Sequence, residues 1–213
     1  MAATTPDNPR EDPLSPRVLM VAYAEGYFPM AESRHSRGVS FYTVDPRAVL
    51  ELDRLRVSRS LRQRVASGVF EVRFDTAFGR VMRACAEPRP DHPETWINEP
   101  IIRAYTRLHQ LGCAHSVEAW REGRLVGGLY GVTMGGAFFG ESMFSRAEEG
   151  GTDASKVCLV HLVEHLRRRR YVLLDVQTNS DHMRRMGVID IPRAEYMRRL
   201  AGALRVEGVS WGE

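Results

Sequence analysis

Cysteine is scarce in this 213-residue sequence, and the few cysteines that occur form no pattern. Cys85, Cys113 and Cys158 are odd in number, lie far apart and sit in apolar contexts. This excludes a disulfide framework and a cysteine-based zinc site, and it fits free thiols in a reducing compartment. Long apolar runs are also missing, so we expect neither a signal peptide nor a membrane span. Together these absences predict a cytoplasmic protein.

Lysine is nearly absent, because almost all of the 30 Lys and Arg residues are Arg. They face 27 Asp and Glu residues, which leaves a formal net charge of only +3. Any anionic partner must therefore bind to a local cluster of positive charge. The planar guanidinium group binds phosphate oxygens in a forked geometry that Lys cannot copy, so the composition slightly favours a nucleic acid as the partner. With 43% hydrophobic residues, the chain can bury the core of one or two domains.

The common motifs of metal and cofactor chemistry are missing too. The glycines within 125–131 lie inside a predicted strand rather than between a strand and a helix, so they indicate close backbone packing and not a phosphate-binding loop. There is no nucleophile elbow and no Cys/His pair that would serve catalysis. No metal-ligand spacing with a matching carboxylate or cysteine occurs around His115, His161, His165 and His182. We therefore expect no metal and no bound cofactor.

The N-terminal quarter predicts a lead-in and a small domain. Its first residues are rich in proline and polar residues and cannot pack, so disorder is expected there. Ser58 is a suitable N-cap for a helix that buries Leu61 and Val65. The elements expected here are a disordered segment 1–16, a helix 18–23, a strand 48–52 and a helix 59–65. We place the boundary before that last helix, which gives a lead-in with a small N-terminal domain over 1–56 and a catalytic domain over 57–213.

In the larger domain, segments with the hydrophobic period of a helix alternate with segments that have the period of a strand. Its expected elements are a helix 100–111, strands 115–120, 125–132 and 137–144, a helix from an Asp153 cap to about 169, and a strand 171–177. Glycine-containing turns separate the first three strands, which indicates an antiparallel meander. A meander followed by a helix and a strand is an α+β arrangement with a central mixed sheet flanked by helices.

Three polar residues stand out in these apolar strands. The period of two puts Asp175 and Gln177 on one face of their strand, and Glu141 lies among phenylalanines next to Gly140, a glycine suited to a β-bulge. Asp175 could instead be satisfied by a loop at the end of its strand, and Glu141 could form an ion pair with an arginine. Two carboxylates and an amide around apolar side chains would form a site for a ligand with one charged and one apolar end.

Two further groups suit a nucleic acid. Five arginines lie within eleven residues and could bind successive phosphates of one backbone: Arg54, Arg56, Arg59, Arg62 and Arg64. A solvated helix face is the more common explanation of such a cluster. Tyr42 and Trp96 could stack on a base, although most aromatic residues belong to a core.

Several longer motifs resemble those of the leucyl/phenylalanyl-tRNA-protein transferases, and the resemblance runs from about residue 19 to 200. The motifs lie at residues 22–29, 45–50, 58–62, 95–97, 115–120, 125–132, 139–145, 154–156 and 191–193. The resemblance implies a small N-terminal domain joined to a domain with the fold of the GCN5-type acetyltransferases (GNAT). It also implies transfer of Leu, Phe or Met from a charged tRNA to a protein N-terminus. The acceptors would begin with Lys or Arg and would be marked for N-end rule degradation.

The same resemblance implies roles for individual residues. Asp175 and Gln177 match the family's catalytic Asp-x-Gln, in which the carboxylate would polarise the amide, and Glu141 matches its active-site glutamate, placed near the donor ammonium. The apolar pocket for the donor side chain would consist of Leu129, Phe138, Met143, Leu159, Leu166 and Leu174. Because Phe138 and Met143 differ in strand parity, both can line it only if a bulge lies near Gly140. Tyr42 and Trp96 would frame the terminal adenosine of the tRNA 3′ end, and the arginine cluster would follow the acceptor stem.

Two other functions compete with this one. An acyl-CoA N-acyltransferase of the same fold needs a glycine-rich loop that opens a helix onto the pyrophosphate. The two closest matches, which begin at Arg124 and Arg184, fail at their last position. A non-catalytic tRNA-binding protein would keep the arginine cluster but would have no reason to keep Asp175, Gln177 and Glu141 together.

Overall fold

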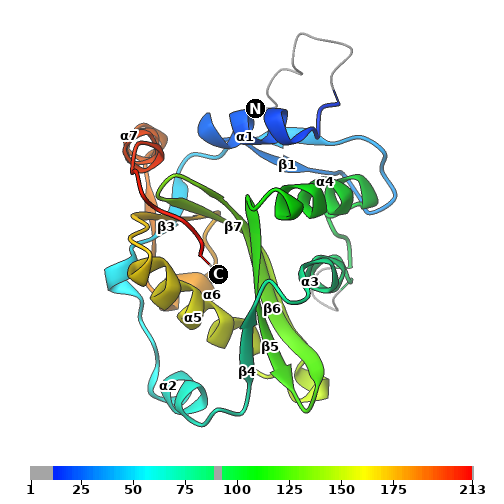
Figure 1. Ribbon diagram of the computed structural model, residues 1–213, viewed down its shortest axis with the longest axis vertical. Helices are drawn as coiled ribbons and strands as arrows, with labels where there is room; N and C mark the ends of the chain where they lie inside the picture. The colour runs from blue at the N-terminus through cyan, green and yellow to red at the C-terminus, as the bar shows by residue number, and fades with distance from the viewer. Residues whose placement is uncertain (1–11, 89–92, 213) are drawn as a thin grey trace.

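A computed structural model describes residues 12–88 and 93–212 of the chain (Figure 1). The strands are β1 Phe28–Met30, β2 Ser40–Tyr42, β3 Arg47–Leu50, β4 Glu71–Phe74, β5 Ala114–Arg121, β6 Arg124–Met134, β7 Ala137–Ser145, β8 Leu173–Gln177 and β9 Val188–Ile191. The α-helices are α1 Pro16–Ala24, α2 Arg59–Ala66, α3 Phe78–Cys85, α4 Glu99–Gln110, α5 Ala154–Arg168, α6 Asp181–Arg185 and α7 Arg193–Leu204. Short 3₁₀ helices cover Leu52–Arg54 and Ala147–Glu149.

A mixed seven-stranded sheet forms the centre of the molecule, in the order β4-β5-β6-β7-β8-β3-β9. Its neighbouring strands are antiparallel except for β7 and β8, which are parallel. Strands β1 and β2 form a separate two-stranded sheet. This is the predicted α+β, GNAT-like architecture, in which helices flank a central mixed sheet.

Helices cover both faces of the large sheet. In Figure 1, α5 lies on one side of the strands and α3 and α4 lie on the other. A first hydrophobic core joins α1, α3, α4 and α7 to the sheet, and it includes Tyr23 and Tyr105. A second core lies under α2 and α5, and it includes Leu61 and Leu159. The sheet thus separates two cores, and the residues of one strand alternate between them.

Most predicted elements are confirmed within one or two residues. The Ser58 hydroxyl accepts the main-chain N–H of Leu61 at 3.2 Å and caps α2 as predicted. The predicted helix over 100–111 is α4, and its N-cap is the side chain of Asn98, which accepts the N–H of Ile101 at 3.0 Å. Strands β5, β6 and β7 form the predicted antiparallel meander.

Three details differ from the predictions. The strand expected over 48–52, assigned to the N-terminal domain, is β3 and pairs with β8 and β9 inside the large sheet. Asp153 precedes α5, but its carboxylate makes no capping hydrogen bond because it binds the ammonium of Lys156 instead. Residues 1–11 of the predicted lead-in lie outside the described residues, and Leu14 of the same segment is buried. The sequence analysis also assigned no element to β4, α3, α6, β9 and α7.

The glycines of β6 pack closely against their neighbours, as predicted. A Cβ atom on Gly131 would lie 2.3 Å from the carbonyl oxygen of Phe139 on β7. This close approach leaves no room for a side chain next to the site described below. Among the helices of the described residues, none is long and apolar enough to cross a membrane.

Candidate functional site

Asp175 lies in the middle of β8 and is fully buried. Its Oδ1 accepts from Nε of Arg47 at 2.9 Å and from the main-chain N–H of Gln177 at 2.8 Å. Its Oδ2 accepts from Nη2 of Arg47 and from the hydroxyl of Tyr196, both at 2.7 Å. A carboxylate offers about four lone-pair sites, and these four donors occupy them. Asp175 therefore has no lone-pair site left for a substrate and serves as a fixed structural group.

The partner of Asp175 is Arg47 of β3, whose side chain is 1% exposed. Its Nη1 donates to the carbonyl oxygen of Gly26 at 3.1 Å, and its guanidinium carbon lies 4.9 Å and 4.7 Å from the ring centroids of Phe28 and Tyr196. Burial alone would lower the pKa of Arg47, but the hydrogen bonds and charge of Asp175 outweigh burial and raise it. A buried ion pair is tolerated only when its remaining polar atoms are also paired, and this one meets that condition.

Gln177 ends β8 with a backbone φ of 62°. This left-handed conformation is uncommon outside glycine, and the hydrogen bond from the Gln177 N–H to Asp175 holds it. The side-chain Nε2 donates to Oε1 of Glu141 at 2.8 Å. Because an ionised carboxylate can only accept, this contact fixes the orientation of the amide and leaves its Oε1 to accept from another donor.

Glu141 occupies a β-bulge in β7. Tyr130 of β6 pairs with Ser142 and Gly131 pairs with Gly140, so Glu141 is the extra residue between them. The bulge predicted near Gly140 is therefore confirmed. A bulge turns the local direction of side chains, and here it places the carboxylate on the side of the sheet that faces α1 and α4.

Two buried tyrosines bind the Glu141 carboxylate. The hydroxyl of Tyr23 donates to Oε1 at 2.8 Å, the hydroxyl of Tyr105 donates to Oε2 at 3.2 Å, and the two hydroxyls contact each other. Burial raises the pKa of Glu141 to about 7, and the charge of Asp175 adds to this rise, while the hydrogen bonds from both tyrosines and the charge of Arg47 oppose it. Glu141 is thus a carboxyl group that titrates near neutral pH.

The strand patterns and motifs locate the three polar residues but not their partners. Asp175 is satisfied by Arg47 and Tyr196 rather than by a loop, and Glu141 binds tyrosines and Gln177 rather than an arginine. The expected contact between the Asp175 carboxylate and the Gln177 amide is not made, because the carboxylate binds the main chain of Gln177. The signal that could have found Arg47 is its place in the motif at 45–50, and Tyr23 likewise lies in the motif at 22–29.

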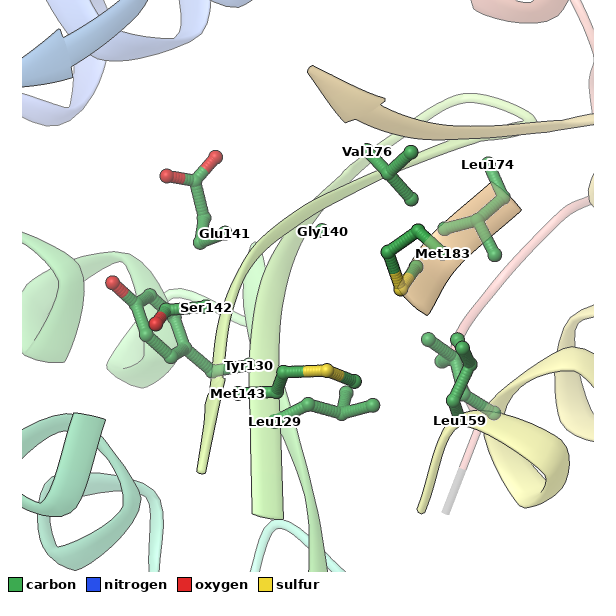
Figure 2. A pocket seen from close by; sticks show the side chains of 11 residues that line it. Leu129, Tyr130, Gly140, Glu141, Ser142, Met143, Leu159, Leu174, Val176 and Met183 are labelled. Atoms are coloured by element: carbon green, nitrogen blue, oxygen red, sulfur yellow. The ribbon is translucent and has the colours of Figure 1, made fainter. Parts of the chain in front are cut away.

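An apolar cavity of about 150 Å³ opens beside these residues. Strands β7 and β8 pair only as far as Phe139 and Asp175, after which β7 follows β6 and β8 follows β3. The cavity lies where the two strands diverge. Its lining consists of Leu129, Tyr130, Gly140, Glu141, Ser142, Met143, Leu159, Leu162, Leu174, Val176 and Met183. In Figure 2 the Glu141 carboxylate points away from the apolar group that contains Met143, Leu159 and Met183. The cavity therefore has an apolar interior with a polar group at its edge.

Four of the six predicted pocket residues line this cavity: Leu129, Met143, Leu159 and Leu174. Phe138 and Leu166 are fully buried in the second core and are not among its lining residues. The Phe138 ring stacks on Trp211 at 5.6 Å between centroids, which explains its position outside the cavity. The lining also includes three apolar residues that the sequence analysis did not select: Leu162, Val176 and Met183.

Tyr42 and Trp96 both lie beside the segment that contains β1. Tyr42 is opposite Phe28 in the two-stranded sheet, and the carbonyl oxygen of Trp96 accepts the N–H of Ala31 at 3.1 Å. Both side chains are partly buried against the first core and do not line the cavity. Their assignment to adenosine binding stays a prediction.

The arginine cluster surrounds the start of α2. Four members, Arg54, Arg56, Arg59 and Arg62, are exposed. Arg54 pairs with Glu51 at 2.8 Å, and Arg64 lies 3.8 Å from Asp153. Helix α2 contacts α5, the helix that supplies Leu159 to the cavity. Arg59, Arg62 and Arg64 therefore lie on the helix that contacts the cavity wall, and Arg54 and Arg56 precede that helix. The role of the cluster toward tRNA stays a prediction.

A second group of polar residues lies away from this cavity. Asp75, His109 and His115 are close enough to share an ion. However, Nδ1 of His109 lies 2.8 Å from the carbonyl oxygen of Ala114, and Nδ1 and Nε2 of His115 face Asp75 at 2.8 Å and Gly112 at 3.1 Å. Because oxygen acceptors already occupy these ring nitrogens, the group is a hydrogen-bonded network that joins β5 to the turn between β4 and α3 and to the end of α4.

Comparison with known families gives matches over nearly the whole chain. The model described as "Leucyl/phenylalanyl-tRNA protein transferase" matches residues 49–201, and that of the N-terminal domain of the same transferase matches residues 12–45. A leucyl/phenylalanyl-tRNA–protein transferase of Rubrobacter xylanophilus is 58% identical over 91% of this chain and 97% of its own length. One of Gloeobacter violaceus is 52% identical over 90% of this chain and 94% of its own length.

Solved structures resemble this chain in fold only. A crystal structure of FemX aligns with a TM-score of 0.50 at 12% identity, covering 86% of this chain and 70% of FemX. A GCN5-related glucosamine N-acetyltransferase region of a fungal β-N-acetylglucosaminidase aligns with a TM-score of 0.48 at 12% identity, covering 83% of this chain and 22% of that one.

The Arg47–Asp175 pair leads to a prediction about stability. Arg47→Met is expected to lower the free energy of unfolding by about 3–5 kcal/mol, because it leaves the Asp175 carboxylate buried without a counter-charge. The double variant Arg47→Met/Asp175→Leu removes both charges and is expected to recover part of that loss. Urea unfolding of the wild type and both variants measures the difference. A double variant no more stable than Arg47→Met would contradict the prediction.

Proposed function

Since this chain belongs to the leucyl/phenylalanyl-tRNA protein transferase family, it is an aminoacyltransferase, and we propose that its donor binds in the cavity between β7 and β8. Family membership favours this function over an acyl-CoA transferase or a non-catalytic tRNA-binding protein. The observation that carries the proposal is the Glu141 carboxylate at the edge of an apolar cavity, with the Gln177 amide hydrogen-bonded to it.

The cavity suits the side chain of the donor amino acid. A dry cavity of about 150 Å³ is known to hold a benzene molecule, so a cavity of this volume can take a Leu, Phe or Met side chain. Met143 can adapt its shape to each, because its side chain is unbranched and flexible. The α-ammonium of the same amino acid would then lie near Glu141, whose ionised form attracts it.

Gln177 would orient the attacking amine. The acceptor α-amine attacks the ester carbonyl carbon, so that a C–N bond forms while the bond to the ribose oxygen breaks. The amine loses a proton, and the leaving ribose oxygen gains one. The free Oε1 of Gln177 can accept a hydrogen bond from the amine and direct its lone pair at the carbonyl. Asp175 contributes by holding the main chain of Gln177, as a positioning residue.

The tRNA would cross the surface from the cavity to α2. Tyr42 and Trp96 are proposed to frame the terminal adenosine, since both are partly buried aromatic residues beside β1. Arg54, Arg56, Arg59, Arg62 and Arg64 are proposed to bind phosphates of the acceptor stem. The support for this path is the contact between α2 and α5, which joins the arginine cluster to the cavity wall.

The acceptor is proposed to be a protein that begins with Lys or Arg, and the product is proposed to enter N-end rule degradation. This part rests on the family resemblance alone. The cytoplasm, where charged tRNA is made, stays our prediction for the location.

The proposed function is tested by transfer from radiolabelled leucyl-tRNA to peptides that differ only in their first residue. Label is expected on peptides that begin with Lys or Arg, and a Gln177→Ala variant is expected to transfer more slowly with unchanged tRNA affinity. Transfer to no peptide would contradict the function, and equal transfer to every peptide would contradict only the acceptor preference.

Donor binding is predicted to depend on pH through Glu141. Burial raises the pKa of this group to about 7, so the ion that attracts an ammonium predominates above that pH and is lost below it. The affinity for an amide-linked leucyl-adenosine analogue should fall by up to about 10-fold for each pH unit below 7. The amine of the ligand also titrates, so a control variant, Glu141→Gln, is needed. This variant should bind the analogue weakly, and its affinity should keep only the pH dependence that comes from the ligand amine. Identical calorimetric profiles for both proteins would refute the assignment.

Salt dependence tests the arginine cluster. Arg59 and Arg62 are exposed on one face of α2. In the variant Arg59→Ala/Arg62→Ala, the slope of log affinity for leucyl-tRNA against log salt concentration should therefore be less steep by about 1–2. The matched control is Arg103→Ala/Arg107→Ala, which removes the same charge from the exposed face of α4. Filter binding over a salt series gives the slopes. If both double variants change the slope equally, the cluster acts only through net charge.

A further inference from the structure

Helix α6 supplies one wall of the cavity from outside the sheet. The other apolar lining residues lie on β6, β7, β8 and the long helix α5, whereas Met183 lies on a helix of five residues between β8 and β9. Figure 2 shows the Met183 side chain beside Leu174 and Val176, facing the same cavity as Met143 and Leu159. Met183 is half-buried, as are Met143 and Val176, so these three form the rim between the interior and solvent.

The position of Met183 is fixed by its neighbours along the chain. The hydroxyl of Ser180 accepts the N–H of Met183 at 3.2 Å and caps the helix. At the other end, the carbonyl oxygen of Met186 accepts the N–H of Arg56 at 2.9 Å, and the Met186 side chain is buried. The helix is therefore capped at its first turn and tied at its other end to the segment before α2, and the Met183 side chain lines the cavity.

The volume of Met183 can change without disturbing a core. Leu129, Leu159 and Leu174 are buried in the second core, so a change in any of them alters the packing of the sheet on α5. Met183 packs against the edge of that core, and its neighbours in α6, Asp181 and Arg184, are exposed. Its length therefore sets how far the cavity extends toward solvent.

From this geometry we propose that Met183 determines which donor side chains the enzyme prefers, by limiting the size of the cavity. The inference rests on the proposed function, because it requires the donor side chain to bind in this cavity. A smaller residue at this position leaves space that Leu cannot fill but a larger side chain can. A larger residue excludes the larger donors first.

The test compares kcat/KM for leucyl-tRNA and phenylalanyl-tRNA in variants of opposite effect. Met183→Ala is expected to lower the value for leucyl-tRNA by about 10-fold and that for phenylalanyl-tRNA by less, on the scale known for methylene-sized changes in apolar pockets. The Phe/Leu ratio therefore rises. Met183→Phe is expected to lower the ratio, and Met183→Leu, which conserves volume, is expected to keep it near the wild-type value.

Arg184→Ala serves as the matched control, because Arg184 follows Met183 in the same helix but is exposed and pairs with Asp181 at 2.8 Å. It should leave the ratio unchanged. Ratios that stay at the wild-type value in both Met183→Ala and Met183→Phe, or that move in the same direction, would overturn the proposal. If Met183→Ala fails to fold, the comparison of Met183→Phe with Met183→Leu decides. If the wild type transfers neither amino acid, the proposed function is contradicted as well. If the wild type transfers both but the ratios do not change as expected, only the role of Met183 is contradicted.

Discussion

The buried ion pair between Arg47 and Asp175 is the interaction on which the rest of the site depends. It joins β3 to β8, and the same two side chains reach α7 through Tyr196 and the end of α1 through the carbonyl of Gly26. A charge as deeply buried as Arg47 would be costly without these partners. The pair therefore fixes the relative positions of segments that are far apart in the sequence, and the strand that carries Gln177 is one of them.

The two halves of the site come from one strand because side chains alternate along it. Asp175 and Gln177 lie on the face of β8 that meets Glu141 and the tyrosines, while Leu174 and Val176 line the apolar cavity. The sheet would normally keep these faces apart. Because β7 and β8 separate after Phe139 and Asp175, one ligand can contact both. The bulge at Glu141 adds the carboxylate at that same point.

This arrangement changes the part that Asp175 is expected to play. Its oxygens are occupied by Arg47, Tyr196 and the main chain of Gln177, so its effect on the Gln177 side chain passes through the backbone. Glu141 lines the cavity and Gln177 is hydrogen-bonded to it, so these two are the groups that we propose to meet the substrate. Glu141 differs from Asp175 because it accepts hydrogen bonds from neutral tyrosine hydroxyls rather than from a guanidinium. Burial raises the pKa of Glu141 to about 7.

The sequence predicts what depends on local periodicity and fails where the outcome depends on distant contacts. The strand period alone put Asp175 and Gln177 on one face, and parity required the bulge near Gly140, which the structure has. The strand period cannot predict the partner of Asp175, because Arg47 is 128 residues away, and only its place in the motif at 45–50 marks it. The position of Phe138 could not be predicted for the same reason. It is apolar and close to Glu141 in sequence, but its ring packs against the distant Trp211 in the second core.

We propose that Arg47 acts on catalysis only by way of Asp175 and the backbone of Gln177. The most direct measurement is a double-mutant cycle of Arg47→Lys and Gln177→Ala, with the single-turnover rate of leucyl transfer as the readout, limited to conditions in which every variant is folded. Arg47→Lys is expected to slow transfer when Gln177 is present, because Lys cannot reproduce the forked contact with Asp175. It is expected to have little further effect in the Gln177→Ala background. An equal loss of rate in both backgrounds would contradict it.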